Sequence, residues 1–266
     1  MALVLAGLTL AFVLGIPLGS IIGAIGGWRS TFLFAGALAL VAAVVVYIVL
    51  PPVAGAVSAG LRRLSIGLRP DLLATLMLTM IGFSATFTVI AYIGPVAARI
   101  AGIEGIGVGG LQALIGVGSI IGIVIGARYA DRPEAMQMVT ASFVTSAVAL
   151  SAYSWLTWAG ANHPVTLPLL IVAMVTGAAA LFARTPAIQA RLVRLDPQST
   201  NVLLALNGSM VFAGQGMGAA IGALTENQFR VSALGFVAAV LVMIGAVSCA
   251  ALVAEHHPQL TPSDPE

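Results

Sequence analysis

Glycine recurs on a strict four-residue step in three segments of this chain, and no other feature restricts its fold as much. Residues four apart lie on the same face of an α-helix, so each set forms a strip without side chains. In lipid such a strip lets two helix backbones approach closely, because packing drives helix association there. A strip about every 100 residues suggests a repeating three-helix plan. The strips are Gly15, Gly19 and Gly23; Gly118, Gly122 and Gly126; and Gly214, Gly218 and Gly222.

The composition identifies an integral membrane protein. Sixty per cent of the 266 residues are hydrophobic and 8% are charged, whereas a soluble domain carries roughly 25% charged residues. The apolar segments are too long for the strands of a membrane barrel and lack their alternation of apolar and polar residues. A helical bundle is the remaining structure that satisfies every backbone polar group in lipid. The chain is therefore predicted to be an all-α membrane protein.

Eight apolar segments are long enough to cross the hydrocarbon layer, which takes roughly 20 residues each. They are separated by short breaks rich in glycine, proline, aspartate and asparagine. The segments are 2–26, 30–50, 71–94, 108–128, 135–159, 165–187, 199–224 and 231–254. The longest connection, 51–70, divides the chain into a two-helix part, residues 1–50, and a six-helix part, residues 71–254. The polar, proline-rich tail, residues 255–266, is predicted to be disordered.

The distribution of arginine predicts the orientation of these helices. Every basic residue is an arginine, and loops on the cytoplasmic side of a membrane are enriched in basic residues. With eight spans both termini lie on one side, where loops and helix ends hold eight arginines against three on the other. We therefore expect a multi-pass protein of the cell (inner) membrane with both termini in the cytoplasm.

Residues 6–32, AGLTLAFVLGIPLGSIIGAIGGWRSTF, carry a resemblance to a known family. They resemble the fifth helix, outer loop and start of the sixth helix of major facilitator superfamily transporters, in the drug and sugar efflux branch called arabinose efflux permeases. The family's helix-five motif of antiporters is matched by Gly15, Pro17 and Gly19, followed by Gly23. One residue separates Gly15 from Pro17, which are adjacent in the strict drug-antiporter form. This departure leaves the choice between drug and sugar open.

Two further matches extend the resemblance over nearly the whole chain. Gly126, Asp131 and Arg132 resemble the second copy of the family's cytoplasmic Gly-x-x-x-Asp-Arg loop, between helices eight and nine. Thr185-Pro186, Gln189, Ala205-Leu206-Asn207 and the Gly214 strip resemble the region of helices ten and eleven. The resemblance thus implies a partial major facilitator fold, helices five to twelve, with 51–70 as the loop between its halves. We expect an internal start, a truncated gene or a fragment.

The resemblance implies a secondary active transporter that works by alternating access. Its partners would be the lipid bilayer, a small-molecule substrate such as a drug or sugar, and protons. The glycine strips would be close-packing surfaces between helices, and such contacts would also serve the interface of the two rocking halves. No aspartate or glutamate falls clearly within a span, so the chain offers no proton carrier of its own. The alternative is a transport-incompetent remnant, or a structural partner that needs the first four helices.

Six residues are singled out for a role in this cycle. Asp131 either acts as a conformational latch, accepting hydrogen bonds from a helix N-terminus or an arginine, or belongs to a solvated turn. Arg184 either reaches out of a helix end into solvent or meets an anionic substrate or counter-charge. Four residues cannot satisfy themselves on their own helix backbone, and they either line the translocation path or tie two helices together. These are Tyr92, Gln112, Asn207 and Gln215.

Other functional classes have no supporting pattern. The three histidines lack metal-ligand spacing, so we expect no metal site and no cofactor. No nucleophile or phosphate-binding motif indicates an enzyme. A net charge of +2 without a basic run gives no reason to expect a nucleic-acid partner.

Overall fold

The computed structural model describes residues 7, 10–49, 69–160 and 164–255, and every regular element within them is helical. Seven helices are long and apolar enough to cross a membrane, and a shorter apolar helix covers Val13–Gly26. These findings confirm the all-α class. Residues 1–6 and 8–9 of the first predicted segment, most of the 51–70 connection and the 256–266 tail lie outside the described residues. The elements are η1 (Ala11–Gly15), α2 (Ile16–Gly26), α3 (Trp28–Val49), α5 (Pro70–Ile90), α6 (Ile93–Ala101), α7 (Ile106–Tyr129), α8 (Ala135–Ala159), α9 (Thr166–Leu195), η4 (Pro197–Ser199), α10 (Thr200–Phe229), η5 (Val231–Ala233) and α11 (Leu234–Glu255).

Two helix boundaries differ from the predicted segments. The segment 71–94 stops being one helix at Ile90, and the short helix α6 follows after a turn. Proline lacks an N–H and its ring crowds the carbonyl group four residues earlier, so Pro95 favours a break near Ala91, between α5 and α6. The segment 165–187 instead extends to Leu195 and holds Pro186 inside the helix. The last turns of this helix contain polar residues, so hydropathy alone does not include them in the segment. They are still helical, because glutamine and arginine have high helix propensity.

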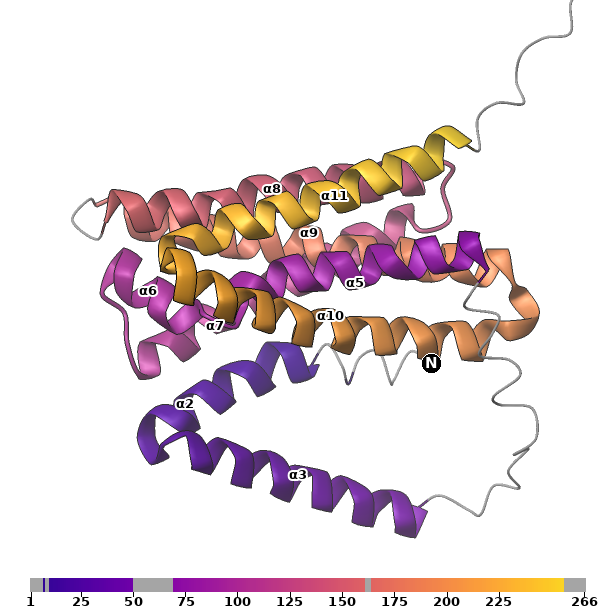
Figure 1. The fold of residues 1–266 in the computed structure, drawn as a ribbon. Helices are drawn as coiled ribbons and strands as arrows, with labels where there is room; N and C mark the ends of the chain where they lie inside the picture. Colours follow the sequence, from indigo (N-terminus) through magenta and orange to yellow (C-terminus); the bar gives the residue numbers. More distant parts are fainter. Residues whose placement is uncertain (1–6, 8–9, 50–68, 161–163, 256–266) are drawn as a thin grey trace, which may run out of the picture.

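Six long helices pack into one bundle, and a two-helix hairpin lies beside it (Figure 1). In the bundle α7 packs on α9, α10 packs on α5, and α8 packs on α11. The pairs α7–α9 and α10–α5 are equivalent when the chain is shifted by three helices. The bundle therefore has the three-helix period that the glycine spacing predicts. The hairpin of α2 and α3 contacts the bundle through α2, which packs on α7.

The glycine strips pack within these units rather than between them. A Cβ on Gly122 or Gly126 would overlap the carbonyl oxygen of a residue in α9, and a Cβ on Gly218 would overlap that of Ser84 in α5. In α2 a Cβ on Gly23 would lie 2.9 Å from Thr31 of α3. These contacts agree with the strips as close-packing surfaces, whereas in the described conformation the strips do not lie on the interface between hairpin and bundle. The glycines let neighbouring helix backbones approach closely, and this packs the helices within the hairpin and within the bundle.

The contact between hairpin and bundle uses two other glycines of α7. A Cβ on Gly109 would lie 3.1 Å from the carbonyl oxygen of Pro17, and one on Gly116 would lie 2.8 Å from the Cα of Val13. Pro17 itself is buried at the second position of α2, directly after the π-helical turn η1. A π-helical turn is one way in which a helix accommodates a break in its hydrogen-bond ladder.

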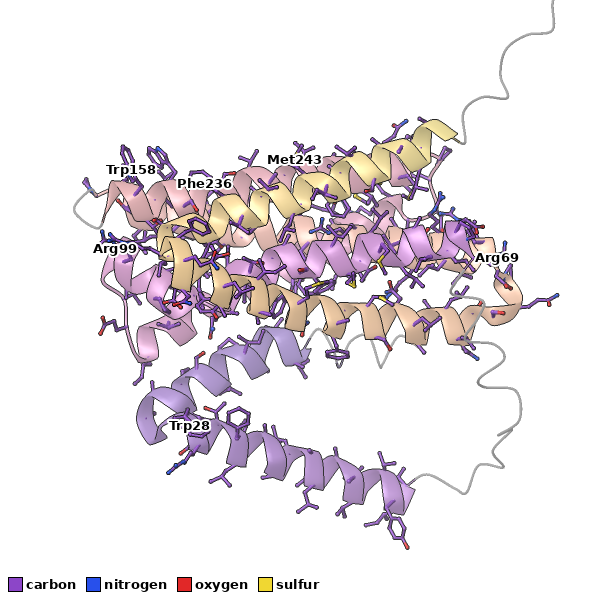
Figure 2. All side chains as sticks on the ribbon, viewed as in Figure 1. Trp28, Arg69, Arg99, Trp158, Phe236 and Met243 are labelled. Carbon is purple, nitrogen blue, oxygen red and sulfur yellow. The ribbon has the colours of Figure 1, made fainter. Side chains whose placement is uncertain are left out.

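The apolar core lies between α5, α8, α9 and α11, whereas no side chain of α3 is buried. The two ends of the bundle are distinguished by their side chains (Figure 2). Trp28, Trp158 and Arg99 lie toward one end, and Arg69 lies at the other. We call these the Arg99 end and the Arg69 end. Tryptophan is enriched where a membrane protein meets the membrane–water interface, which fits the two tryptophans at the Arg99 end.

Candidate functional site

A polar contact joins α5 and α10 inside the bundle. The Thr79 hydroxyl donates a hydrogen bond of 2.7 Å to Oδ1 of Asn207, and both side chains are buried. Most other threonines of α5 bond their own helix, as Thr86 and Thr88 do with carbonyl oxygens four residues back. Asn207 lacks that option, so it pairs across the helices. In this conformation Asn207 ties two helices together.

Tyr92, which precedes α6, contacts α10, and Gln215 belongs to α10. The Tyr92 hydroxyl donates to the carbonyl oxygen of Ala219 at 3.5 Å. A Cβ on Gly222 would lie 2.6 Å from the Tyr92 ring. The Nε2 atom of Gln215 is buried without a hydrogen-bond partner. A buried hydrogen-bond donor without a partner lowers the stability of the fold, so a native structure contains few of them. Gln215 therefore supplies, within the described residues, a buried donor of the predicted path that is not used.

Gln112 connects the hairpin to the bundle. Its Oε1 accepts a hydrogen bond from the Ser20 hydroxyl of α2, across the contact between α2 and α7. The contact is otherwise made by apolar side chains and by the close approach of Gly109 and Gly116. Few directional bonds hold this interface. It is the kind of contact along which two units can shift.

Arg184 occupies the interior of the bundle, so the expectation that it reaches solvent from a helix end is wrong. Its side chain is 2% exposed. One guanidinium nitrogen donates to the Ser146 hydroxyl at 3.2 Å, and Nε donates to the carbonyl oxygen of Leu181 at 3.3 Å. The guanidinium carbon lies 4.2 Å from the centroid of the Phe143 ring. Nη1 has no partner.

The space for this arginine is made by a glycine. A Cβ on Gly82 of α5 would lie 3.1 Å from the guanidinium carbon of Arg184. No carboxylate of the described residues forms an ion pair with Arg184. An intramembrane charge that faces the interior of a bundle is expensive and is a candidate functional residue for that reason.

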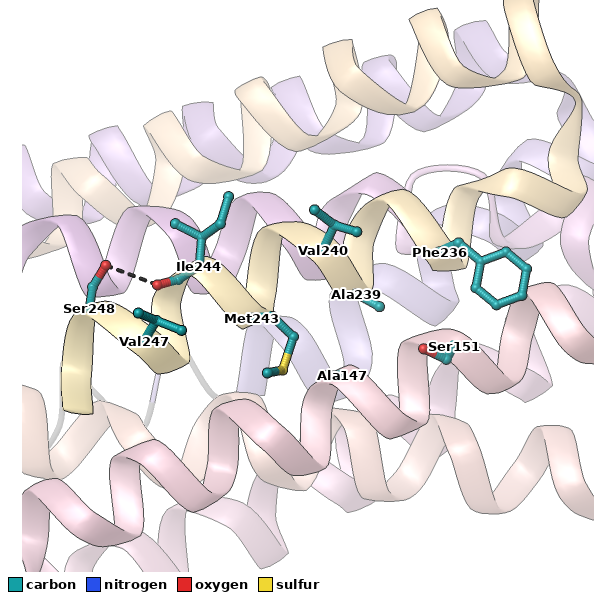
Figure 3. A pocket seen from close by; sticks show the side chains of 9 residues that line it. All are labelled: Ala147, Ser151, Phe236, Ala239, Val240, Met243, Ile244, Val247 and Ser248. Carbon is teal, nitrogen blue, oxygen red and sulfur yellow. Dashed lines mark hydrogen bonds between the residues drawn. The ribbon is translucent and has the colours of Figure 1, made fainter. Parts of the chain in front are cut away.

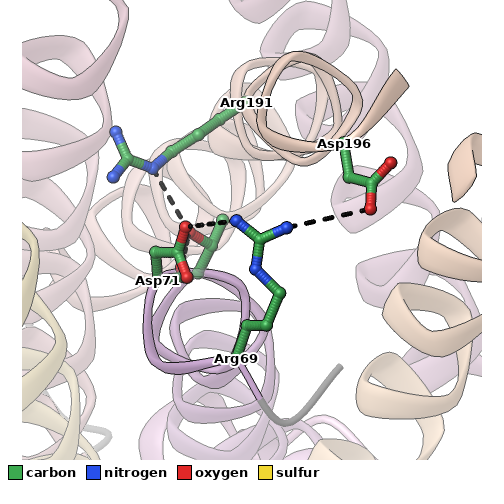
Figure 4. A network of polar contacts seen from close by, with 5 residues as sticks. Arg69, Asp71, Arg191 and Asp196 are labelled. Carbon is green, nitrogen blue, oxygen red and sulfur yellow. Dashed lines mark hydrogen bonds and ion pairs between the residues drawn. The ribbon is translucent and has the colours of Figure 1, made fainter. Parts of the chain in front are cut away.

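A network of charged residues lies at the Arg69 end of the bundle and connects the start of α5 with the end of α9 (Figure 4). The Arg69 guanidinium lies 3.4 Å from Asp71 at the start of α5 and 3.9 Å from Asp196 at the end of α9. Beside it Nε of Arg191 donates to the Thr75 hydroxyl at 3.2 Å. Sequence reasoning missed this network, because its members are dispersed over distant positions of the chain. The only available signal was that Arg69 and Asp196 both stand immediately before a proline.

The Gly126–Arg132 region lies at the same end but outside this network. Asp131 is exposed, and its carboxylate forms no hydrogen bond or ion pair within the described residues. Arg132 stacks on Tyr129, with its guanidinium carbon 5.0 Å from the ring centroid. The turn is held to α9 by Arg194, which donates to the carbonyl oxygen of Ala130 at 3.0 Å. The latch role of Asp131 stays a prediction.

A further pocket has none of these residues in its wall. It has a volume of about 630 Å³ and lies between α8 and α11 (Figure 3). Its wall is apolar apart from Ser151 and Ser248, and Ser248 bonds its own helix at the Ile244 carbonyl. Phe236 and Val240 on its rim are more than half exposed. An open apolar groove on the outside of a membrane bundle faces lipid, so we do not assign it to transport.

The structure thus distributes the predicted residues over three places. Asn207 and Gln215 lie on α10 and Tyr92 contacts it, at different levels of that helix; Gln112 lies on α7 at the contact with the hairpin, and Arg184 lies among α5, α8 and α9. Among the described residues no three histidine, cysteine or acidic side chains gather as metal ligands would. Cys249 is a buried free thiol whose Sγ lies 3.5 Å from the carbonyl oxygen of Met136.

These features define a class of protein: a multi-pass helical membrane protein built on a three-helix repeat with polar groups inside its bundle. A comparison with protein families then gives the particular family. The family model described as Major Facilitator Superfamily matches residues 1–200. The chain belongs to this superfamily, which consists of secondary transporters.

Proposed function

We propose that this chain takes part in the export of a small solute by alternating access, in exchange for protons. One observation carries the proposal: a member of a transporter superfamily has two helical units that meet along the smooth α2–α7 contact. Gly109 and Gly116 bring the backbones together there, and among the described residues a single side-chain hydrogen bond, from Ser20 to Gln112, crosses it. Rocking of two units about such a contact is how transporters of this architecture expose a central site to either side.

The helices correspond, in this proposal, to helices five to twelve of the family fold. Residues 1–50 supply the end of the first half, 51–70 the connection between halves, and 71–254 the second half, followed by the 255–266 tail. The motif around Gly15 and Pro17 supports this assignment, as does the three-helix period of the bundle. The excess of arginine at the Arg69 end favours the inner membrane with both termini in the cytoplasm.

The polar groups inside the bundle favour an uncharged or anionic substrate, in the range of drugs and sugars. Asn207, Gln215 and Tyr92 offer hydrogen bonds without charge, and Arg184 is the one charged side chain among the buried residues of the described helices. Nη1 of Arg184 and Nε2 of Gln215 are donors without partners. These N–H groups can donate hydrogen bonds to acceptor atoms of a solute once the two units have moved.

A second candidate is that the chain transports nothing without further helices. No aspartate or glutamate lies inside a described span away from its ends; a proton-coupled carrier needs a carboxylate that gains and loses a proton there. The α3 helix also buries none of its side chains against the rest of the described structure. Both observations fit a remnant or a structural partner.

A transport assay separates the two candidates. Cells that express the chain are loaded with ethidium or with labelled arabinose, and efflux is followed with and without a protonophore. Protonophore-sensitive efflux above that of cells with an empty vector supports the carrier. Efflux equal to the empty vector, although the protein is folded in the membrane, supports the second candidate and rejects the first.

A matched pair of variants ties any efflux to the α2–α7 contact. Gly116→Leu places a side chain against the backbone of Val13, whereas Gly110→Leu in the same helix enters open space. We expect Gly116→Leu to lower the rate at least about tenfold, because a small misplacement of moving parts has large kinetic effects. Gly110→Leu is expected to transport as the wild type does. Equal rates for both variants would mean that this contact has no part in the cycle.

A further inference from the structure

Three arginines line a pocket at the Arg69 end that has no carboxylate in its wall. The pocket has a volume of about 290 Å³ and lies between the start of α8 and the end of α9. Its charged residues are Arg132, Arg191 and Arg194. Pro133, Ala135, Met136 and Leu195 complete the wall.

The guanidinium groups of this pocket keep donors available. Arg191 uses Nε on the Thr75 hydroxyl, while its Nη2 is buried without a partner. Arg194 uses one Nη2 hydrogen bond to the Ala130 carbonyl oxygen. Arg132 stacks on Tyr129 and forms no ion pair within the described residues. Arginine presents five N–H donors in a fixed fork, so each of the three retains capacity for an acceptor.

The helix geometry adds to the positive potential. Ala135 and Met136 belong to the first turn of α8, whose N-terminal end carries a partial positive charge; the Ala135 N–H itself is bonded to the Arg132 carbonyl oxygen. The carboxylates nearby stand outside the pocket wall, although Asp71 also attracts Arg191 electrostatically. Asp131 and Glu134 are exposed and outside its wall, and Asp71 and Asp196 face Arg69.

We propose that this pocket binds a phosphate group, held by Arg132, Arg191 and Arg194 at the N-terminus of α8. Arginine forks match phosphate oxygens in geometry as well as charge. The phosphate comes either from the headgroup of an anionic lipid or from a soluble phosphate. The apolar side chains of Met136 and Leu195 beside the arginines, and the position of the pocket at the end of spanning helices, fit the lipid. A bound phosphate would clamp the α7–α8 turn to the end of α9.

The test uses the full chain purified in a zwitterionic detergent. Native mass spectrometry measures the binding of phosphatidylglycerol and of phosphatidylcholine, and calorimetry measures the binding of inorganic phosphate at constant ionic strength. The variants are Arg132→Gln, Arg194→Gln and their double variant. Both residues are exposed, so these variants are expected to fold, and thermal unfolding without added lipid verifies this. Arg128→Gln is the control, since it removes the same charge at the same end from a residue outside the pocket.

A lipid site predicts that phosphatidylglycerol binds more tightly than phosphatidylcholine. Each single variant then weakens phosphatidylglycerol binding about fivefold, the double variant weakens it more, and Arg128→Gln leaves it unchanged. A soluble-phosphate site predicts the same pattern for inorganic phosphate, with no preference between the lipids. Either pattern supports the site. Variants that bind as the wild type does, or an equal loss in Arg128→Gln, would overturn the proposal, because binding would then follow net charge alone.

Discussion

The guanidinium group of Arg184 lies 4.2 Å from the centroid of the Phe143 ring, and no carboxylate of the described residues pairs with this buried charge. The contact with the ring face and the hydrogen bond to Ser146 only partly replace the water that the guanidinium has lost. The arrangement costs stability. A costly charge that a fold retains in its interior points to a role beyond packing.

Arg184→Met is therefore expected to leave the protein at least as stable as the wild type, and up to about 4 kcal/mol more stable, because apolar replacements of buried charged groups often have this effect. Thermal unfolding in detergent measures it. Arg99→Met, at an exposed position, should change stability by less than about 0.5 kcal/mol. If Arg184 serves the transported solute, efflux falls in Arg184→Met although stability does not. A clear loss of stability would mean that an unseen partner satisfies the charge.

The glycine strip of α10 gives a second prediction. A Cβ on Gly218 would overlap the carbonyl oxygen of Ser84, whereas a Cβ on Gly216 would meet nothing within 4 Å. Gly218→Ala should lower the free energy of unfolding by about 1–3 kcal/mol, since a packed backbone must move to make room. Gly216→Ala should be neutral or stabilise by up to about 1 kcal/mol, because alanine favours the helix. Equal effects in thermal unfolding would show that the strip does not set the α5–α10 distance.

The glycine strips also show how far the sequence could be interpreted. Spacing by four identifies a face of a helix, and composition identifies lipid as its surroundings, so close packing and the three-helix period were predictable. Spacing does not identify the neighbour. Gly122 faces α9 within the bundle, while the contact between hairpin and bundle uses Gly116, which belongs to no regular strip.

The interior of the site was harder to predict for a different physical reason. The hydropathy of the α9 segment falls shortly after Arg184, although the helix continues to Leu195. In the sequence Arg184 therefore looked like a residue at the end of a helix, whereas it is buried. The Arg69–Asp196 pair joins two residues far apart in the chain. Such pairs depend on how helix ends meet, which the pattern of a single segment does not contain.

The hydrogen bond between Thr79 and Asn207 gives a third prediction. Thr79→Val and Asn207→Leu each leave one buried partner unsatisfied, while the double variant removes both. The double-mutant cycle should therefore show a coupling free energy of about 0.6–1.7 kcal/mol, the range for hydrogen bonds between membrane helices. Thr88 is the control, because it bonds Ser84 of its own helix. Thr88→Val combined with Asn207→Leu should be additive within about 0.5 kcal/mol.

Asp131 gives a fourth prediction, which tests the latch. Because its carboxylate has no partner in the described conformation, Asp131→Asn should leave thermal unfolding unchanged within about 0.5 kcal/mol. If the carboxylate accepts a hydrogen bond only in another state of the cycle, the variant shifts the populations of the two states. Efflux would then fall while the affinity for substrate remains. A variant that exports at the wild-type rate would leave Asp131 as a residue of a solvated turn.

The orientation of the chain gives the last prediction. Glu104 lies in the connection between α6 and α7 at the Arg99 end, and Asp131 lies in the turn at the Arg69 end; both are exposed. Glu104→Cys and Asp131→Cys are made in a Cys249→Ser background, which removes the single native thiol. If the Arg69 end is cytoplasmic, a membrane-impermeant maleimide labels Glu104→Cys in spheroplasts and labels Asp131→Cys only after the membrane is opened. The reverse pattern would place the arginine-rich end outside, against the rule that basic loops stay in the cytoplasm. Labelling of both cysteines in sealed spheroplasts would show that the two loops are not on opposite sides.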